Sequence, residues 1–222
     1  MKQTVVIVNA ELPVKPKSRY DLGNSSLKAR CGAGVVIDKN GAILTSEYLV
    51  PDNANAIRVR RGIDETFWEA KLMYRSRKHD LAIIVPKEKV DRFHFATFDT
   101  EDRFDVGKEV LSISHTGDFL YSLMIGHLAC QDHRFFRDVW EEKEDVAPFS
   151  LSDDLKLMQI NNFHSGENAM GAPVFSSSGK VIGLTSFVLK GYDFAVHSTV
   201  LKEFCGSYQE AIGKGKGKAE EE

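Results

Sequence analysis

The stretch GENAMGAPVF, Gly166 to Phe175, runs directly into SSSGKVIGL, which ends at Leu184. Its second half predicts a β-hairpin, because the apolar runs APVF and KVIGLTSFVL flank a turn at Ser177-Ser178-Gly179. Short strands joined by such turns are the units of antiparallel sandwiches and barrels. The same pattern recurs along most of the chain.

Roughly a dozen β-rich runs follow one another with turn residues between them. In order they read TVVIV, AGVVID, AILTS, IRVRR, FWEAKLMY, DLAIIVP, EVLSIS, YSLMIGHLAC, LKLMQI, APVF, KVIGLTSFVL and YDFAVH. Helical periodicity is sustained only in STVLKEFCGSYQEAI, which predicts one helix with Ser198 as its N-cap. The pattern predicts an all-β fold, an antiparallel sandwich or a pair of barrels, with a C-terminal helix.

Composition narrows the classes of partner. The 222 residues are 42% hydrophobic, enough for a sizeable core, and carry a formal net charge of -3. That charge argues against a general affinity for nucleic acid or anionic membrane and favours protein or peptide partners. No segment resembles a signal peptide or a spanning helix, and Cys31, Cys130 and Cys205 form no close-spaced pair. We expect a cytoplasmic or nuclear protein with no nucleic acid and no membrane partner.

Six basic residues fall on two strands of a predicted surface hairpin: Arg58, Arg60, Arg61, Arg75, Arg77 and Lys78. Nucleic-acid sites combine such residues with interleaved aromatic side chains or a positive net charge. We therefore expect a solvated strand face, with a docking patch for an acidic protein segment as the alternative.

Several motifs, taken in order, resemble the protease domain of the HtrA family, also called protease Do-like or Deg. GAGVVIDKNGAILT, Gly32 to Thr45, is similar to the family's GSGVIID-DGYILT, and DLAIIVP is similar to DLAVLKV. GKVIGLTS and YDFAVHSTVLKEF are similar to GEVIGINT and GFAIPSNLVK. The resemblance extends from Thr4 to about Phe204, and it implies the trypsin-like fold of two antiparallel six-stranded barrels with a C-terminal helix.

The resemblance also implies a domain organisation. We expect the first barrel in residues 1–100, the second barrel and the terminal helix packed on it in 101–206, and the helix end with a disordered Gly/Lys/Glu tail in 207–222. Few residues follow Phe204, so we expect no PDZ domain. Relatives trimerise through N-terminal segments outside the barrels, and this chain starts almost at its first strand, so we expect a monomer.

In the family a histidine, an aspartate and a serine form the catalytic triad in the cleft between the barrels. Tyr48 stands at the histidine position, in ILTSEYLV against ILTNNHVV, and Asp80 in HDLA matches the aspartate. Met170 stands at the serine position, in NAMGAP against GNSGGP. A phenol is a poor general base at neutral pH and a thioether is no nucleophile. The resemblance therefore predicts an inactive pseudoprotease with a degenerate triad.

The loop that would form the oxyanion hole contains Asn168, Ala169 and Gly171. Asn168 replaces a glycine whose amide helps to bind the oxyanion, and asparagine tolerates the left-handed backbone conformation. We expect this loop to keep its shape without its chemistry.

A hydrolase with a relocated nucleophile is the alternative function. Ser165, Ser176–Ser178 and the cysteines are candidates, but the fold places no histidine or oxyanion hole beside them. His79 neighbours Asp80, and alternation along a strand would turn it away from the cleft. We expect no metal, because Cys130 to His133 has no second ligand cluster, and no cofactor, because no phosphate-binding loop is present.

The resemblance implies a groove in which an extended peptide pairs with a strand edge, here Leu184, Thr185, Ser186 and Phe187, with Phe194 in the pocket wall. Strand addition needs free backbone groups and no catalytic residue. We therefore expect a protein- or peptide-binding or regulatory module. Two alternatives stay open: large side chains fill the cleft and move binding to outer surfaces, or the chain pairs with an active relative.

Overall fold

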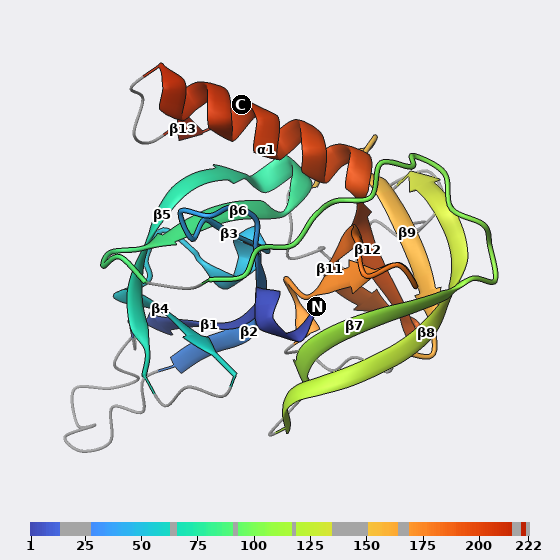
Figure 1. Cartoon of the computed structure of the whole chain (residues 1–222), viewed down its shortest axis with the longest axis horizontal. Helices are drawn as coiled ribbons and strands as arrows, with labels where there is room; N and C mark the ends of the chain where they lie inside the picture. Colours follow the sequence, from blue (N-terminus) through green and yellow to red (C-terminus); the bar gives the residue numbers. More distant parts are fainter. Residues whose placement is uncertain are drawn as a thin grey trace, which may run out of the picture.

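The strands form two β-barrels side by side, and one helix runs along the top of the molecule (Figure 1). The computed structural model describes residues 1–13, 28–62, 66–90, 93–116, 119–134, 151–163, 169–214 and 219–220. Within these ranges no helix is both long enough and apolar enough to cross a membrane. The predicted fold class, two antiparallel six-stranded barrels with a C-terminal helix, is confirmed.

Six strands build the first barrel: β1 (Val5–Leu12), β2 (Lys28–Val36), β3 (Ile43–Thr45), β4 (Ala56–Arg61), β5 (Trp68–Ser76) and β6 (Leu81–Pro86). They pair in the order β5-β4-β1-β2-β3-β6, and the pairing of β5 with β6 closes the ring. Three short 3-10 helices accompany them: η1 (Lys2–Thr4), η2 (Glu47–Leu49) and η3 (Arg77–His79). Valine and isoleucine make up half of β1 and half of β6, because β-branched side chains pack well on a pleated surface.

Six further strands build the second barrel: β7 (Glu109–Thr116), β8 (Phe119–Arg134), β9 (Lys156–Asn161), β10 (Pro173–Phe175), β11 (Val181–Leu189) and β12 (Tyr192–His197). Their order is β10-β11-β12-β9-β8-β7, and β10 closes the barrel against β7. The predicted hairpin is β10–β11, with Gly179 at a φ of 77° in its turn. Glycine adopts that conformation without steric cost.

Successive side chains of β1 point to opposite faces of the sheet and so belong to two different core clusters. Val6 and Val8 point into the first barrel, whereas Val5 belongs to a cluster between the barrels that also contains Leu184 of β11. A third cluster around Met158 fills the second barrel. The seam between the barrels is therefore a packed apolar layer, in which any buried polar group needs a partner.

Helix α1 (Ser198–Gly213) covers part of both barrels. Its N-cap is His197 rather than the predicted Ser198, since Nδ1 of His197 accepts a hydrogen bond from the amide of Thr199 at 3.1 Å. The helix contacts β11 and β12, as expected for packing on the second barrel. On its other side, the ring of Tyr74 in β5 lies 5.0 Å from that of Phe204, between centroids. The helix thus also holds the first barrel.

Part of the predicted disordered tail forms strand β13 (Ala219–Glu220), which runs parallel to β5 opposite Tyr74 and Arg75. Strand β4 pairs with β5 only at residues Trp68 to Ala70. The later part of β5, around Tyr74 and Arg75, therefore has an edge with which β13 can pair. Residues 215–218 and 221–222 lie outside the described ranges.

Candidate functional site

Three segments bring the predicted triad positions together at the seam between the barrels. Tyr48 lies in η2, directly after β3; Asp80 lies between η3 and β6; and Met170 precedes β10. The amide of Tyr48 donates to Oδ1 of Asp80 at 3.0 Å, and the carbonyl of Met170 accepts from the amide of Ala33 at 2.9 Å. Tyr48 and Met170 also pack against the same apolar cluster. The seam therefore presents a phenol, a carboxyl group and a thioether.

The carboxyl group of Asp80 accepts three hydrogen bonds. Besides the amide of Tyr48, the hydroxyl of Ser46 donates to Oδ1 at 2.7 Å, and the hydroxyl of Ser186 donates to Oδ2 at 2.5 Å. Asp80 is only 2% exposed and has a left-handed backbone with a φ of 53°, which aspartate tolerates better than most residues. Because Ser186 belongs to β11, this carboxyl group joins the two barrels.

Burial raises the pKa of Asp80 to about 7, while the three hydrogen-bond donors oppose the rise. The charge of Glu47 adds to it. No histidine stands among the hydrogen-bond partners described for Asp80. Hydroxyl and amide donors thus occupy the carboxyl group that, in a catalytic triad, would orient an imidazole.

The half-buried ring of Tyr48 lies beneath a guanidinium group. Cζ of Arg30 is 3.9 Å from the ring centroid, within the range of cation–π attraction, and Nη1 of Arg30 donates to the carbonyl of Tyr48. The ring also packs against the cluster inside the first barrel. Side chains of the chain itself therefore fill this side of the seam.

Ion pairs fix the 3-10 helix that carries Tyr48. Arg75 in β5 is 7% exposed; it binds Glu47 at 3.1 Å and also pairs with Asp52. Arg77 pairs with the same two carboxylates. The prediction of a solvated basic strand face is therefore wrong for Arg75, because a buried guanidinium needs carboxylate partners. The pairs hold η2 against β5.

The loop before β10 approaches the first barrel closely at Gly171. Gly171 has a φ of 75°, and a Cβ there would lie 2.3 Å from the carbonyl oxygen of Ala33, so only glycine fits. Its amide donates to the carbonyl of Thr185 at 2.8 Å, and the hydroxyl of Thr185 donates to the buried Ala169. Ala169 and Gly171 thus fix this loop between the barrels. Asn168, the remaining predicted oxyanion residue, lies outside the described residues.

The predicted peptide-binding strand has an open edge over part of its length. Leu184 pairs with Pro173 on one side and Val196 on the other, so both of its edges are occupied. The backbone of Thr185 bonds to the loop before β10 and pairs with β12. Between 186 and 189, β12 is the only described strand that pairs with β11. The edge left for an added strand is this four-residue segment.

The side chains around that edge differ in exposure. Phe187 and Phe194 stack with their ring centroids 5.1 Å apart and are both buried, so they form a wall rather than an open pocket. The hydroxyl of Ser186 is bonded to Asp80. Val188, in contrast, is 45% exposed. Val188 is therefore an exposed apolar side chain on this segment.

The hydrogen bonds described for Ser176 and Ser178, two of the alternative nucleophiles, involve no histidine. The hydroxyl of Ser176 donates to Asp99 at 3.2 Å and lies 2.8 Å from that of Ser178. Burial raises the pKa of Cys205 to about 12, and it also raises the pKa of Cys31. A thiol with a raised pKa is a poor nucleophile at neutral pH. Ser165 lies outside the described residues.

His79 lies in a 3-10 helix rather than on the expected strand. Its Nδ1 is 3.1 Å from the hydroxyl of Ser76. Across the described ranges, no group of three or more His, Cys, Asp or Glu side chains could hold a metal ion.

Sequence reasoning missed the two serines that hold Asp80. The hydroxyl of Ser46 reaches Asp80 across 34 positions of sequence, and that of Ser186 reaches it across 106. No local pattern signals such a contact, because it depends on how the two barrels dock. The buried Arg75 was missed for the same reason, although Glu47 and Asp52 supplied the complementary charges.

Comparison with known proteins agrees with this architecture. The family described as "Trypsin-like peptidase domain" matches residues 32–184. A protein of Pseudomonas fulva (strain 12-X) named "Probable periplasmic serine endoprotease DegP-like" is 27% identical over 195 residues, which cover 85% of this chain and 37% of that protein. Proteins with the same name from Hahella chejuensis and Pseudomonas putida (strain W619) are each 28% identical, over 155 and 178 residues.

Those two matches cover 70% and 79% of this chain, and 29% and 32% of the relatives. The chain thus spans about a third of the length of the relatives it matches. The family match covers more than half of the chain: it begins within β2 and ends within β11, and so includes strands of both barrels. On these grounds the chain belongs to the trypsin-like peptidase domain family.

Proposed function

We propose that this chain is a pseudoprotease, a trypsin-like domain without peptidase activity that binds an extended peptide or protein segment. The residues at the seam between the barrels support this proposal. Tyr48 and Met170 stand at the predicted base and nucleophile positions, and Asp80 is hydrogen-bonded to Ser46 and Ser186. Neither a phenol beneath a guanidinium nor a thioether can start acyl transfer. Binding of a peptide by strand addition requires neither a catalytic histidine nor a catalytic serine.

The site for the peptide in this proposal is the β11 edge from Ser186 to Leu189. An added strand takes its affinity from main-chain hydrogen bonds and its selectivity from side-chain contacts. Exposed Val188 and the wall of Phe187 and Phe194 favour an apolar side chain in the bound segment. The partner is thus expected to be an extended segment with apolar residues.

Loss of peptidase activity is tested with an unstructured protein mixture, whose new peptide termini are read by mass spectrometry. Wild type and Asp80→Asn, purified identically, should both leave the mixture intact. Termini that appear with wild type and vanish with Asp80→Asn would contradict the proposal. A fluorophosphonate probe gives a second readout: it should not label wild type, and labelling of one serine would favour the relocated nucleophile.

Peptide binding is tested separately by selecting nonapeptides from a random library displayed on phage. We expect the selected peptides to bind wild type and the matched control Val188→Thr, and to bind Val188→Pro at least about tenfold more weakly, because proline removes a main-chain donor. Circular dichroism checks that the proline variant keeps its fold. Equal binding to all three folded proteins would exclude the β11 edge while leaving the absence of peptidase activity untouched.

A further inference from the structure

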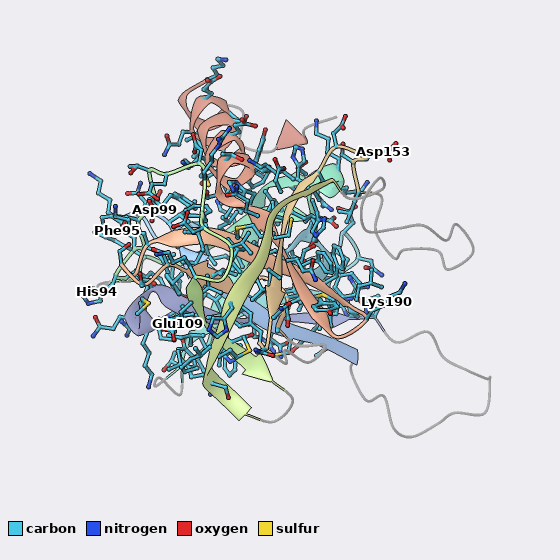
Figure 2. The ribbon with its side chains drawn as sticks, turned by 90° about the vertical axis from the view of Figure 1, so that its right-hand side faces the viewer. His94, Phe95, Asp99, Glu109, Asp153 and Lys190 are labelled. Carbon is cyan, nitrogen blue, oxygen red and sulfur yellow. The ribbon has the colours of Figure 1, made fainter. Side chains whose placement is uncertain are left out.

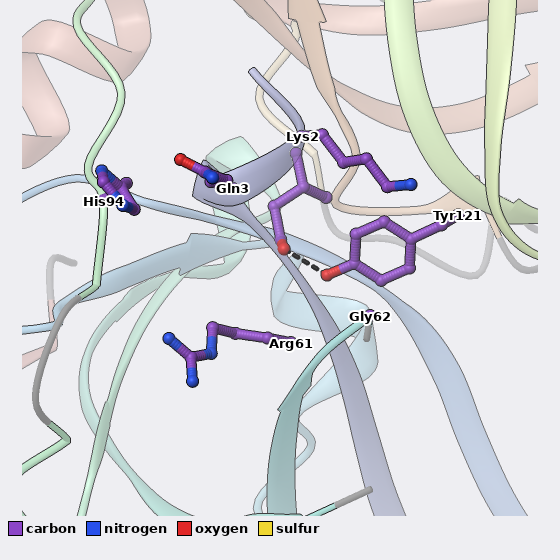
Figure 3. Close-up of a pocket in the computed structure, with 7 residues that line it drawn as sticks. Lys2, Gln3, Arg61, Gly62, His94 and Tyr121 are labelled. Atoms are coloured by element: carbon purple, nitrogen blue, oxygen red, sulfur yellow. Dashed lines mark hydrogen bonds between the residues drawn. The ribbon is translucent and has the colours of Figure 1, made fainter. Parts of the chain in front are cut away.

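A cavity of about 350 Å³ opens where the second barrel meets the first strand (Figure 3). Its lining residues come from both barrels and from the connection between them: Lys2, Gln3, Val5, Arg61, Gly62, His94 and Tyr121. Its volume is within the range of small-molecule sites, roughly 300–1,000 Å³, and most of its surface is apolar, as is usual for such sites. Val5 pairs with Val35 on β2, whereas Val8 pairs with Gly32 beside Met170, so three residues of β1, about 10 Å, separate the cavity from the triad positions.

One wall of the cavity, Tyr121, is fixed in place before any ligand arrives. Its hydroxyl donates to the carbonyl of Val5, and its amide donates to Nδ1 of His115 at 3.2 Å (Figure 3). Its ring centroid lies 5.2 Å from that of His115. A Cβ on Gly62 would come within 1.9 Å of the Tyr121 ring, so the ring can occupy this place only because residue 62 is glycine. An aromatic wall held in this way is preorganised for binding.

The charged ends of the two cationic lining residues do not converge on the cavity. The guanidinium of Arg61 lies over the rings of Trp68 and Phe93, 5.5 and 5.9 Å from their centroids. Figure 3 shows the ammonium of Lys2 and the guanidinium of Arg61 pointing in different directions. An anion in the cavity would give up its hydration without gaining two converging partners, which costs free energy. The lining therefore favours a neutral ligand.

The lining is apolar on one side and polar on the other. Figure 3 shows the ring of Tyr121 next to Gly62, and Gln3 and His94 across the cavity from them. The side chains of Gln3 and His94 belong to exposed residues, so a ligand can reach them from solvent. A carboxamide and a neutral imidazole can each donate and accept a hydrogen bond. The cavity thus offers an aromatic surface opposite two neutral hydrogen-bonding groups.

We propose that this cavity binds a small neutral aromatic molecule that carries one amide or hydroxyl group. The aromatic ring of the ligand lies against Tyr121, where its burial and the ring–ring contact both contribute to affinity. The polar group of the ligand lies towards Gln3 and His94, which can bond to it. Because the lining comes from both barrels, a ligand that binds only the folded chain also stabilises their docking. This site is separate from the β11 edge, and its occupation does not depend on whether the chain has peptidase activity.

The experiment titrates the full chain with 3-phenylpropanamide and follows amide chemical shifts by NMR, with thermal unfolding as a second readout. The matched ligands are propanamide, which lacks the ring, and 3-phenylpropionate, which carries a charge in place of the amide. The variants are Tyr121→Ala and Gln3→Ala, and their controls are Tyr192→Ala and Gln209→Ala at two exposed positions. Tyr192 is two residues from Lys190, which lies on the opposite side of the molecule from His94 (Figure 2).

We expect saturable shifts at Tyr121 and Gly62 with 3-phenylpropanamide, a higher midpoint of thermal unfolding, and binding at least about tenfold weaker for either matched ligand. Tyr121→Ala should weaken binding at least about tenfold and Gln3→Ala several-fold, while both controls leave it unchanged. Equal or tighter binding of the carboxylate would overturn the proposal, as would equal effects of each variant and its control. Circular dichroism checks the fold of Tyr121→Ala; if that variant unfolds, Gln3→Ala and the matched ligands still decide the outcome.

Discussion

Asp80 at the seam and His197 at the start of α1 are both buried titratable groups, but their surroundings differ. Asp80 accepts hydrogen bonds from Ser46, Tyr48 and Ser186, which come from both barrels. The hydrogen bonds of His197 are to Thr199, two residues away, and its Nε2 has no hydrogen-bond partner within the described structure. Burial makes each group harder to charge: it raises the pKa of Asp80 to about 7 and lowers that of His197 to about 4.

The difference shows how one buried carboxyl group can contribute to the docking of two barrels in a trypsin-like domain. Asp80 connects segments that are far apart in the sequence, so its loss disturbs the docking of two barrels. His197 satisfies one amide in the first turn of a helix, and its loss is local. A substitution at each position, and a change of pH, should separate the two roles.

The largest effect is expected for Asp80→Ala. At about pH 5, where the Asp80 carboxyl is protonated, the substitution removes the acceptor of the Ser46 hydroxyl and the Tyr48 amide and the partner of the Ser186 hydroxyl. It also puts alanine at a positive φ, so we expect a loss of about 3 kcal/mol or more in the free energy of unfolding. Urea denaturation measures it. Asp80→Asn, which keeps one oxygen and tolerates the left-handed conformation, should lose less. Equal losses for both variants would mean that the hydrogen bonds to this side chain contribute little.

The second effect is a pH dependence of opposite sign at the two groups. The pKa of Asp80 is raised on folding, so the folded state binds a proton that the unfolded state releases, and its contribution to stability is lost as pH rises from about 4 to about 7. The stability of wild type relative to Asp80→Asn should fall by on the order of 3 kcal/mol over this interval. A constant difference across the interval would show that the Asp80 carboxyl is ionised throughout.

His197, whose pKa is lowered, contributes stability that is present above about pH 6.5 and is lost as pH falls towards 4. His197→Ala should cost about 1 kcal/mol at neutral pH through loss of the N-cap, measured by thermal unfolding. His197→Asn should retain most of the cap and lose the acid sensitivity that this imidazole supplies. Acid sensitivity unchanged in His197→Asn would assign it to other groups, His115 among them, whose pKa burial also lowers to about 4.

The smallest effect on stability is expected for Tyr48→His, which tests whether the seam still accepts an imidazole. A protonated imidazole beside Asp80 should lower the pKa of that carboxyl group from about 7, by roughly one unit, as seen in the titration of its ¹³C NMR signal. Tyr48→Phe is the matched control and should leave the pKa in place. An unchanged pKa in Tyr48→His would mean that the side chain of residue 48 points away from Asp80.

Much of the fold follows from local pattern. Short β-rich runs separated by turn signals predicted the twelve barrel strands, and helical periodicity predicted α1, because these features depend on neighbours in the sequence. Short motifs in the right order predicted the barrel pair. The helix cap shifted by one residue, from Ser198 to His197, because an imidazole can accept the amide bond that the serine hydroxyl was expected to accept.

The candidate site could be placed from the sequence but not described. Motif order located Tyr48, Asp80 and Met170, and the fold brings their loops together. The stacking of Arg30 on Tyr48 and the bonds of Ser186 to Asp80 depend on docking between segments distant in sequence. The limited extent of the β11 edge depends on where β10 ends, which no propensity marks.

The packing of α1 on Tyr74 has a consequence for synthesis of the chain. The helix is made after both barrels, so during translation the Tyr74 face of β5 lacks Phe204 and Tyr208, its aromatic neighbours. Until the helix leaves the ribosome, the nascent first barrel presents this aromatic surface to chaperones and to other nascent chains. The outer surface of the first barrel is therefore completed only after α1 has been translated.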